Sequence, residues 1–236
     1  MRHCWLVLLA IVALLSPVAA DCLVYRLPED GSFARFDLEI KEQRGDDSKT
    51  ATGSFTMSSV GAKEVDGKKC RWIEIKMIIK QGEREQVQIV KVLTPEEHLK
   101  AGSSAIEHMI KGWAGRPGKE ARAVEGSKDR RLGPVSAFLC GPFMNAKKLP
   151  AMEIDTKVGK FTCTGVTGSI KIEQDKTVVE VVFDNRLSDK APFGVVSSNM
   201  KYKATRADGE TRDQGTVSLK LVEVGKNAKS DLPDSQ

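Results

Sequence analysis

The stretch "RWIEIKMIIKQGEREQVQIVKVL" (residues 71–93) contains two runs of alternating side chains joined by one turn. From residue 73 to residue 79 every second side chain is apolar, and the residues between them are mostly polar. This period of two is typical of a strand with one face in a core. Gln81-Gly82 then turns the chain into a second apolar run at 87–93. Two such runs with a short connection predict neighbouring antiparallel strands.

Similar patterns recur on both sides of this stretch. Alternation is visible at residues 36–41, 54–58, 179–183 and 217–221. Asp-Gly pairs at 66–67 and 208–209 mark tight hairpin turns, because these residues accept the positive φ angles such turns require. The sequence therefore predicts a mainly β (α+β) fold, built as an antiparallel meander. We expect a single β-rich domain over 21–224, followed by a polar, disordered tail over 225–236.

The pattern changes at Thr94, where a helical and loop insertion is expected over 94–133. Residues 94–97 and 104–107 each place a hydroxyl three positions before a glutamate, the capping box of a helix start. Apolar residues from 106 to 113 then fall on one helical face. We predict a short helix, a break near Gly102, and an amphipathic helix that ends by Gly112 or Gly115.

The N-terminus has the three parts of a signal peptide. A short charged region precedes an apolar run at 5–15, and Val18-Ala19-Ala20 forms a small-residue cleavage site. We expect residues 1–20 to be removed, which places the mature chain in the periplasm or outside the cell. An uncleaved anchor is the alternative, and a lipoprotein is disfavoured because Asp21 precedes Cys22. No later segment approaches the ~20 apolar residues of a membrane-spanning helix.

Cysteine usage fits an exported protein. Removal of the signal peptide leaves Cys22, Cys70, Cys140 and Cys163. An even number of cysteines in an exported chain favours two disulfides, whose pairing the sequence does not determine. Buried free thiols are the alternative, because a domain of this length does not need disulfides to fold.

The formal net charge of +5 is mild, but cations concentrate in one loop, residues 114–133. Its cations are Arg116, Lys119, Arg122, Lys128, Arg130 and Arg131. This loop could meet an anionic surface or an envelope protein, although a solvated loop is the plainer interpretation. Nucleic-acid binding is not expected, because the loop has no aromatic side chains for bases to stack on.

Two segments carry a resemblance to a known family: "VGKFTCTGVTGSI" (158–170) and "NRLSDKAPFGVVSSNMKY" (185–202). A Gly-x-Phe-x-Cys strand, a hairpin, a Ser-Asp-x-x-Pro-x-Gly loop and a further strand follow in that order. This order resembles exported bacterial proteins with a lipoprotein-carrier-like (LolA-like) half-barrel. The resemblance implies a curved sheet around helices, with an apolar or lipid-like ligand in the concavity. Pro192 and Gly194 are expected to redirect the chain between two strands, with Phe193 packed inward.

The leading hypothesis is an exported, non-enzymatic protein that binds an apolar or lipid-like ligand or a lipidated partner. The residues expected to line its concavity are Trp72, Ile73, Ile75, Met77, Met109, Trp113, Phe183 and Phe193. The alternative is a structural or protein-interaction module of the cell envelope, which would use the helical insertion and the basic loop.

An enzyme is disfavoured by the sequence. Only His98 and His108 remain in the mature chain, and they are expected on separate helical pieces. Their spacing matches no compact metal-ligand motif, and no nucleophile elbow or phosphate-binding loop is present. The sequence therefore predicts no catalytic residue, no metal and no cofactor.

Overall fold

The computed structural model describes residues 23–132, 135–139, 143–174 and 177–232. The signal peptide, Cys22 and Cys140 lie outside the described residues. The elements in chain order are β1 (Phe33–Arg44), β2 (Asp47–Val65), β3 (Lys68–Gln81), β4 (Arg84–Pro95), the 3-10 turn η2 (Glu96–His98), β5 (Lys111–Gly115), β6 (Arg122–Ala123), the 3-10 turn η3 (Arg130–Leu132), α1 (Val135–Leu139), β7 (Met144–Thr156), β8 (Gly159–Gln174), β9 (Thr177–Leu187), the 3-10 turn η4 (Pro192–Gly194), β10 (Val195–Arg206) and β11 (Thr211–Gly225).

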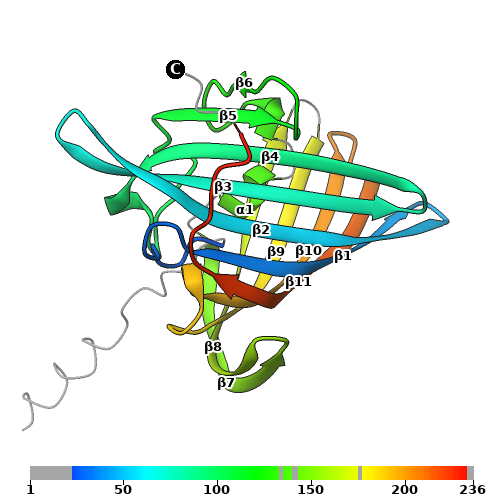
Figure 1. Ribbon diagram of the computed structural model, residues 1–236. Coiled ribbons are helices and arrows are strands. Elements are labelled where there is room, and N and C mark those ends of the chain that lie inside the picture. The colour runs from blue at the N-terminus through cyan, green and yellow to red at the C-terminus, as the bar shows by residue number, and fades with distance from the viewer. Residues whose placement is uncertain (1–22, 133–134, 140–142, 175–176, 233–236) are drawn as a thin grey trace, which may run out of the picture.

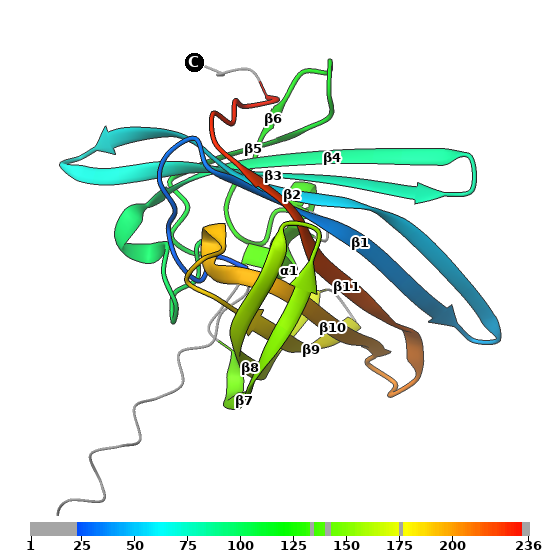
Figure 2. The same cartoon turned by 60° about the horizontal axis from the view of Figure 1, so that its bottom comes forward.

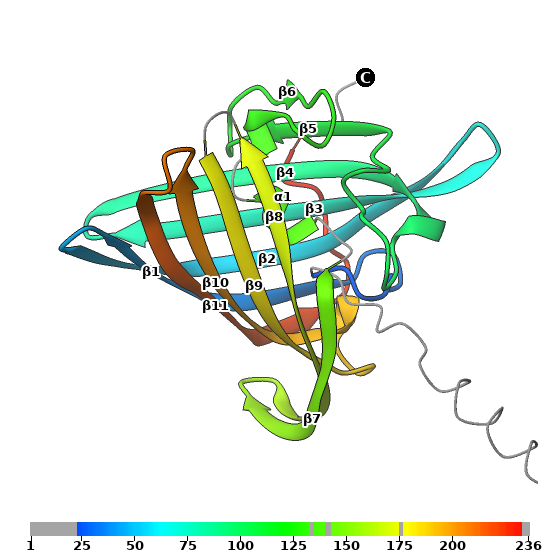
Figure 3. The same cartoon turned by 180° about the vertical axis from the view of Figure 1, so that it is seen from behind.

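All these strands belong to one open sheet with the order β6-β5-β4-β3-β2-β1-β11-β10-β9-β8-β7. Strands that follow each other in the chain pair antiparallel, except β6 and β7, which are the two edges of the sheet, and β1 also pairs antiparallel with β11. The sheet thus has two limbs, β1 to β6 and β7 to β11, joined along β1 and β11. Figures 1 and 2 show the limbs bending toward each other around α1. Seen from behind, β8 to β11 cross over β1 to β4 (Figure 3). The predicted curved meander or half-barrel is confirmed.

The strands form where the alternation predicted them. In β3, Ile73 and Ile75 are fully buried and face the core, while Lys76 faces outward and is half-buried. The turn before β3 has positive φ at both Asp66 (51°) and Gly67 (74°). Both residue types tolerate that conformation, so the hairpin register is fixed by local chemistry.

The sheet bends because its ladders are interrupted and because glycine lets two strands approach closely. The register shifts between Arg35 and Phe36 and between Ser59 and Ala62. Gly53 of β2 lies so close to β3 that a Cβ atom on it would be 1.8 Å from the carbonyl oxygen of Ile78. Bulges increase local twist and bend the strand that carries them. These positions therefore give the long strands the curvature of a half-barrel.

The concave face is filled by segments of the chain itself. Phe36 and Phe55 of the sheet contact each other edge-on, and Phe138 of α1 packs against Phe55 with ring centroids 4.6 Å apart. Leu23 and Leu99, from the segments before β1 and after η2, are buried in the same cluster. We call these inner segments the plug: residues 23–27, 99–106 and 132–139 where described.

The predicted helical insertion is wrong in its main element. Residues 94–133 contain the short turns η2 and η3, turns over 99–109, and the strands β5 and β6. Strand pairing overrides the helical periodicity, because Trp113 pairs with Lys91 of β4 in the ladder. The second capping box makes one contact, from the backbone N–H of Glu107 to the Ser104 hydroxyl (3.4 Å), and no helix follows it. The basic loop is likewise structured in part, as β6 and η3.

The Ala-Pro-Phe-Gly step does redirect the chain. Pro192–Gly194 forms the turn η4 between β9 and β10, with positive φ at Phe193 (58°) and Gly194 (84°). Phe193 is fully buried, and its carbonyl oxygen accepts backbone hydrogen bonds from Tyr25 and Arg26. The expected inward packing of Phe193 is what the structure has.

The expected disorder of the tail fails for residues 226–232. Lys226 forms an ion pair with Glu29 (2.8 Å), and the backbone N–H of Ala228 donates to the carbonyl of Gly31. Leu232 is buried. A polar composition predicted disorder, but this short segment lies on a folded surface that satisfies its polar groups.

Candidate functional site

Six of the expected lining residues lie in the interior. Ile73, Ile75, Phe183 and Phe193 are fully buried, Met77 is nearly so, and Met109 is half-buried against the same cluster. They belong to one hydrophobic cluster with the buried plug residues, so they form a packed core where an open concavity was expected.

Trp72 and Trp113 lie on the other face of the sheet. Trp72 precedes the inward-facing Ile73 in β3, and the Lys91 ammonium is 5.0 Å from the centre of its ring. Trp113 pairs directly with Lys91 across β4 and β5. Because successive side chains of a strand point to opposite faces, these two residues do not line the concavity.

An apolar surface that the sequence analysis missed lies at one end of the concave face. On six strands (β1, β3 and β8 to β11) the inward-facing row continues past the plug with side chains that are only half-buried but still pack against the core. They are Ile40, Ile79, Ile172, Val179, Tyr202 and Val217. We call this set the open end. The alternation that marks it was visible in the sequence, but the place where the plug stops was not.

Tyr202 and Gly215 adjoin each other at the open end. The two residues pair across β10 and β11, and a Cβ on Gly215 would be 2.7 Å from the Tyr202 hydroxyl. Burial raises the pKa of Tyr202, and the carboxylates of Glu42 and Asp213 raise it further. The phenol therefore stays neutral and offers a polar end to an otherwise aliphatic surface.

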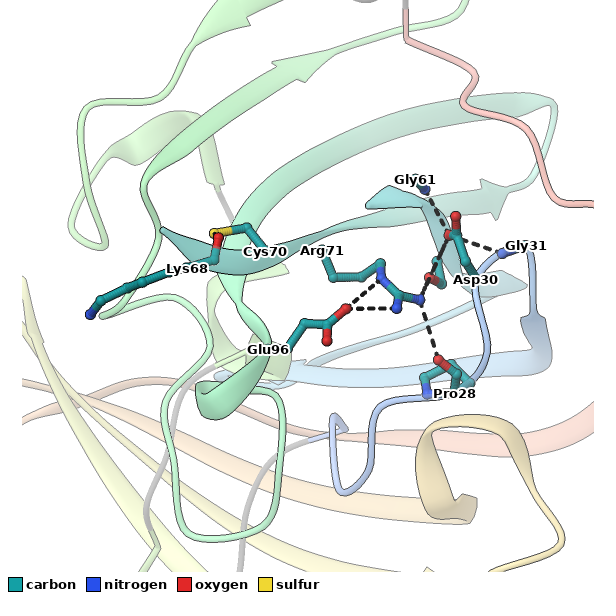
Figure 4. Close-up of polar contacts among 9 residues, drawn as sticks. Pro28, Asp30, Gly31, Gly61, Lys68, Cys70, Arg71 and Glu96 are labelled. Atoms are coloured by element: carbon teal, nitrogen blue, oxygen red, sulfur yellow. Dashed lines mark hydrogen bonds and ion pairs between the residues drawn. The ribbon is translucent and has the colours of Figure 1, made fainter. Parts of the chain in front are cut away.

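A polar cluster surrounds Arg71 near the start of β3 (Figure 4). Its guanidinium donates to Glu96 from Nε (3.1 Å) and Nη2 (2.7 Å), and to the Ser59 hydroxyl (3.0 Å). Asp30 accepts from the Ser59 hydroxyl and from the backbone N–H of Gly61 (2.8 Å). The cluster joins the segment before β1 to the bulge of β2 and to η2. The side chains of Arg71, Glu96, Ser59 and Asp30 each make a hydrogen bond within the cluster, which indicates a structural role.

A groove of about 1140 Å³ lies on the outer face, between the central strands and the end of the β7–β8 hairpin. Lys157 at that hairpin forms an ion pair with Asp37 of β1 (2.7 Å). The lining mixes Arg35, Asp37 and Glu85 with apolar Ile78 and Met152. This groove has no dominant charge or apolar character that would select a ligand class.

The structure brings the two histidines together, which the sequence analysis did not expect. Their rings stack with centroids 3.5 Å apart. His98 Nδ1 is 3.2 Å from the Ser103 hydroxyl, and Nε2 is 3.6 Å from the Glu97 carboxylate. Glu97 and His108 are exposed, so water reaches this arrangement. Among the described residues, no three His, Cys, Asp or Glu side chains are grouped to hold a metal.

The basic loop is organised by Asp129. Its carboxylate accepts the backbone N–H groups of Glu125 and Arg131, both at 2.8 Å, and these hydrogen bonds lower the pKa of Asp129. Arg131 also donates to the carbonyl of Ala123. The six cations of the loop are all exposed. Part of the basic charge is thus used to hold the loop itself.

The expectation of two disulfides is wrong. Cys70 and Cys163 are free and fully buried. They lie in different limbs of the sheet, Cys70 in β3 and Cys163 in β8. Burial raises the pKa of the Cys163 thiol, which keeps it protonated and unreactive. The alternative of buried free thiols holds for these two cysteines.

No family model and no curated protein matches the sequence. Solved structures are similar in fold. A protein described as exported, with a YMCC-like fold, from Bacteroides fragilis has a TM-score of 0.34 and 8% identity, over 86% of this chain and 99% of its own. A DUF1329 family protein from Desulfovibrio piger has a TM-score of 0.31 and 9% identity, over 85% and 87%. A LolA superfamily protein from Nitrosomonas europaea has a TM-score of 0.29 and 12% identity, over 90% and 92%. The family that the sequence resemblance named is thus represented among these neighbours by one LolA superfamily protein.

Within the described part of the chain, no helix has the length and apolar character to cross a membrane.

Proposed function

We propose that the protein binds an apolar chain, such as the acyl chain of a lipid or of a lipidated protein, at the open end of its half-barrel. The observation that carries this proposal is the row of half-buried apolar side chains beyond the plug. A soluble protein gains by covering such a surface, because each methylene removed from water contributes about 0.8 kcal/mol. No covalent step is involved, so the function is binding and not catalysis.

The geometry supports an elongated ligand. Ile79 of β3 and Val179 of β9 belong to different limbs, and Ile40 and Val217 pair with each other at the seam between them. A chain that contacts both limbs would lie across the seam, with the plug residues at its inner end. Tyr202 supplies a neutral hydroxyl for a polar head group at the outer end.

The expected interior ligand site moves outward in this proposal. Ile73, Ile75 and Phe183 support the site from behind as part of the packed core, while the contact surface lies at the open end. Trp72 and Trp113, on the outer face, are not assigned to it.

The first test is native mass spectrometry of the mature chain, residues 21–236, purified from an exporting host without detergent. Extra mass that organic extraction removes would support the proposal and identify the ligand class. A second test titrates dansyl-labelled undecanoic acid, whose emission rises when it leaves water. Unlabelled dodecanol should displace it, since the alkyl chain supplies most of the binding energy. If the protein carries no bound mass and also shows no saturable binding of the label, the proposal is rejected.

Matched variants locate the site. Val179→Ser removes an inward aliphatic group, and Val178→Ser makes the same change one residue earlier on the outward face. We expect Val179→Ser to weaken binding about fivefold, which corresponds to about 1 kcal/mol of lost apolar contact, and Val178→Ser to leave it unchanged. Ile79→Ser and Ile78→Ser provide the same comparison on β3. Equal losses within each pair would place the ligand elsewhere.

The envelope-module alternative has less support. Its helical face is absent, because residues 104–115 form turns and β5. Its basic loop remains exposed, and binding to anionic vesicles that Arg130→Gln abolishes would favour it.

A further inference from the structure

The segment after β11 crosses the outer face of the other limb. From Gly225 the chain passes over β2 and β3 toward β5, as the red trace of Figures 1 and 2 shows. Ser230, Asp231 and Leu232 make its contacts there. We call these three residues the strap.

Three donors of the strap converge on one buried carboxylate. The Ser230 hydroxyl donates to Glu74 Oε2 (2.5 Å), the Asp231 backbone N–H to Oε1 (3.0 Å), and the Leu232 backbone N–H to Oε2 (3.5 Å). Glu74 is only 3% exposed, although it points away from the main core. A buried carboxylate without such partners would be strongly unfavourable, so this position is built to hold a chain segment.

The two side chains after Ser230 are held by different chemistry. Asp231 forms an ion pair with Lys76, the next outward residue of β3 (2.9 Å). Leu232 is 2% exposed and packs on Gly115 of β5, where an added Cβ would lie 3.0 Å from its methyl group. Ile89, the ladder partner of Gly115, is fully buried outside the main core cluster. The outer face thus has a small apolar pocket of its own.

We propose that the outer face of β3 to β5 is a peptide-binding site, and that the strap occupies it until a partner replaces it. The partner is an extended segment of another protein in which a Ser or Thr is followed by an acidic residue and a branched aliphatic one. Glu74 binds the hydroxyl and two backbone N–H groups, Lys76 binds the acid, and the Gly115 pocket takes the aliphatic side chain. Residues 226–229 link the strap to β11, so it can leave while every strand stays paired.

The test uses the mature chain with its strap released by the double substitution Asp231→Lys and Leu232→Ser. The probe is a fluorescein-labelled peptide with the sequence of residues 226–236. Binding is followed by the anisotropy of the fluorescein label and by tryptophan emission. Tryptophan emission reports on this site because the mature chain contains only Trp72 and Trp113, which lie beside the cross-strand pair Glu74 and Lys91. A peptide with the same two replacements is the control.

We expect the natural peptide to bind the strap-released chain and the control peptide not to bind. The unmodified chain should bind at least about tenfold more weakly, since its own strap competes at an effective millimolar concentration. Adding Glu74→Gln to the released chain should weaken binding about tenfold or more. No binding by a released chain with unchanged circular dichroism, or binding indifferent to Glu74→Gln, would overturn the proposal.

Hydrogen exchange on the unmodified chain gives a second measurement that needs no folded variant. The amides of residues 230–232 should exchange by local opening, faster than those of β3 beneath them, and millimolar unlabelled peptide should increase their exchange. Equal exchange in the strap and in β3 would overturn the proposal, because a strap that leaves only on global unfolding cannot give up its site.

Discussion

The imidazole rings of His98 and His108 stack in parallel, with centroids 3.5 Å apart and planes 9° apart. Burial lowers the pKa of His98, and the charge of His108 lowers it further. Lys68 and Lys100 add to this effect, while Glu97 opposes it. His98 is therefore a neutral side chain at neutral pH, held in a turn that its protonation would disturb.

This pair predicts a stability that falls in mild acid. In the unfolded chain His98 titrates near its ordinary pKa of about 6.5. At a pH between the lowered pKa of folded His98 and the ordinary pKa of unfolded His98, the unfolded state binds more protons than the folded state. The free energy of unfolding therefore rises with pH across this range and becomes constant above the unfolded pKa. Urea unfolding followed by tryptophan emission at about pH 5.5 and 7.5 measures the slope. His98→Gln should flatten it, and an unchanged slope in that variant would contradict the assignment.

Two neighbouring ion pairs should differ sharply in their contribution to stability. Arg71 is 11% exposed and Glu96 28%, whereas Lys68 and Glu97 are 61% and 57% exposed. Arg71→Gln strands a partly buried carboxylate and should cost about 2–4 kcal/mol. Lys68→Gln should cost under about 1 kcal/mol, because water already screens its partner. Urea unfolding of the two variants measures both losses of stability. Similar losses would show that burial does not determine how much each ion pair contributes.

The strands were predictable because their signal is local. The alternation at 73–79 gave both the strand and its inward face, and Asp66-Gly67 gave the turn before it. The curvature of the sheet was expected only through the resemblance at 158–202. The order of the two limbs was not predicted, because pairing between β1 and β11 joins residues at opposite ends of the chain. No short-range pattern records such a pairing.

The helical insertion failed for a physical reason. Residues 104–113 have a cap and a helical apolar face, yet residues 111–115 pair with β4 as a strand and residues 104–109 form turns. The buried Thr94 hydroxyl, expected to cap a helix, instead donates to the carbonyl of Ala105 (3.0 Å). Tertiary pairing of this kind overrides local propensity.

The candidate sites were predicted only in part. The inward residues of β3 and β9 were found, but which of them the plug covers depends on the packing of α1 and the N-terminal segment. The strap was missed because Ser230-Asp231-Leu232 is too short and polar to signal order. Only the buried Glu74 beneath it, which accepts three hydrogen bonds from these residues, shows that the segment is ordered.

Gly53 should be essential to the bend of the sheet. A Cβ atom there would be 1.8 Å from the Ile78 carbonyl oxygen, a backbone atom that cannot turn away. Gly53→Ala should therefore cost more than about 2 kcal/mol. Gly67→Ala faces open space and should cost about 1–2 kcal/mol, for its positive φ alone. Chemical denaturation of the two variants tests this, and a smaller loss at Gly53 would mean that β3 moves aside readily.

The cysteines should divide into one disulfide and two free thiols. Cys70 and Cys163 are free. Cys22 and Cys140 lie outside the described residues, but their neighbours are joined: the Leu23 N–H donates to the Phe138 carbonyl (3.0 Å). Because Cys70 and Cys163 are free, Cys22 and Cys140 can pair only with each other. The contact between their neighbours favours this single disulfide.

Alkylation of the mature chain with iodoacetamide tests this division by intact mass. The native protein should take up no label, because Cys70 and Cys163 are fully buried. In urea without reductant those two thiols should react, and in urea with reductant all four should. Such a disulfide would join the N-terminal segment to the chain just beyond α1. Reduction should therefore also lower the free energy of unfolding in urea, by the ~2–5 kcal/mol that a native disulfide contributes. Four labelled cysteines without reductant, or a peptide map with Cys70 in a disulfide, would contradict the prediction.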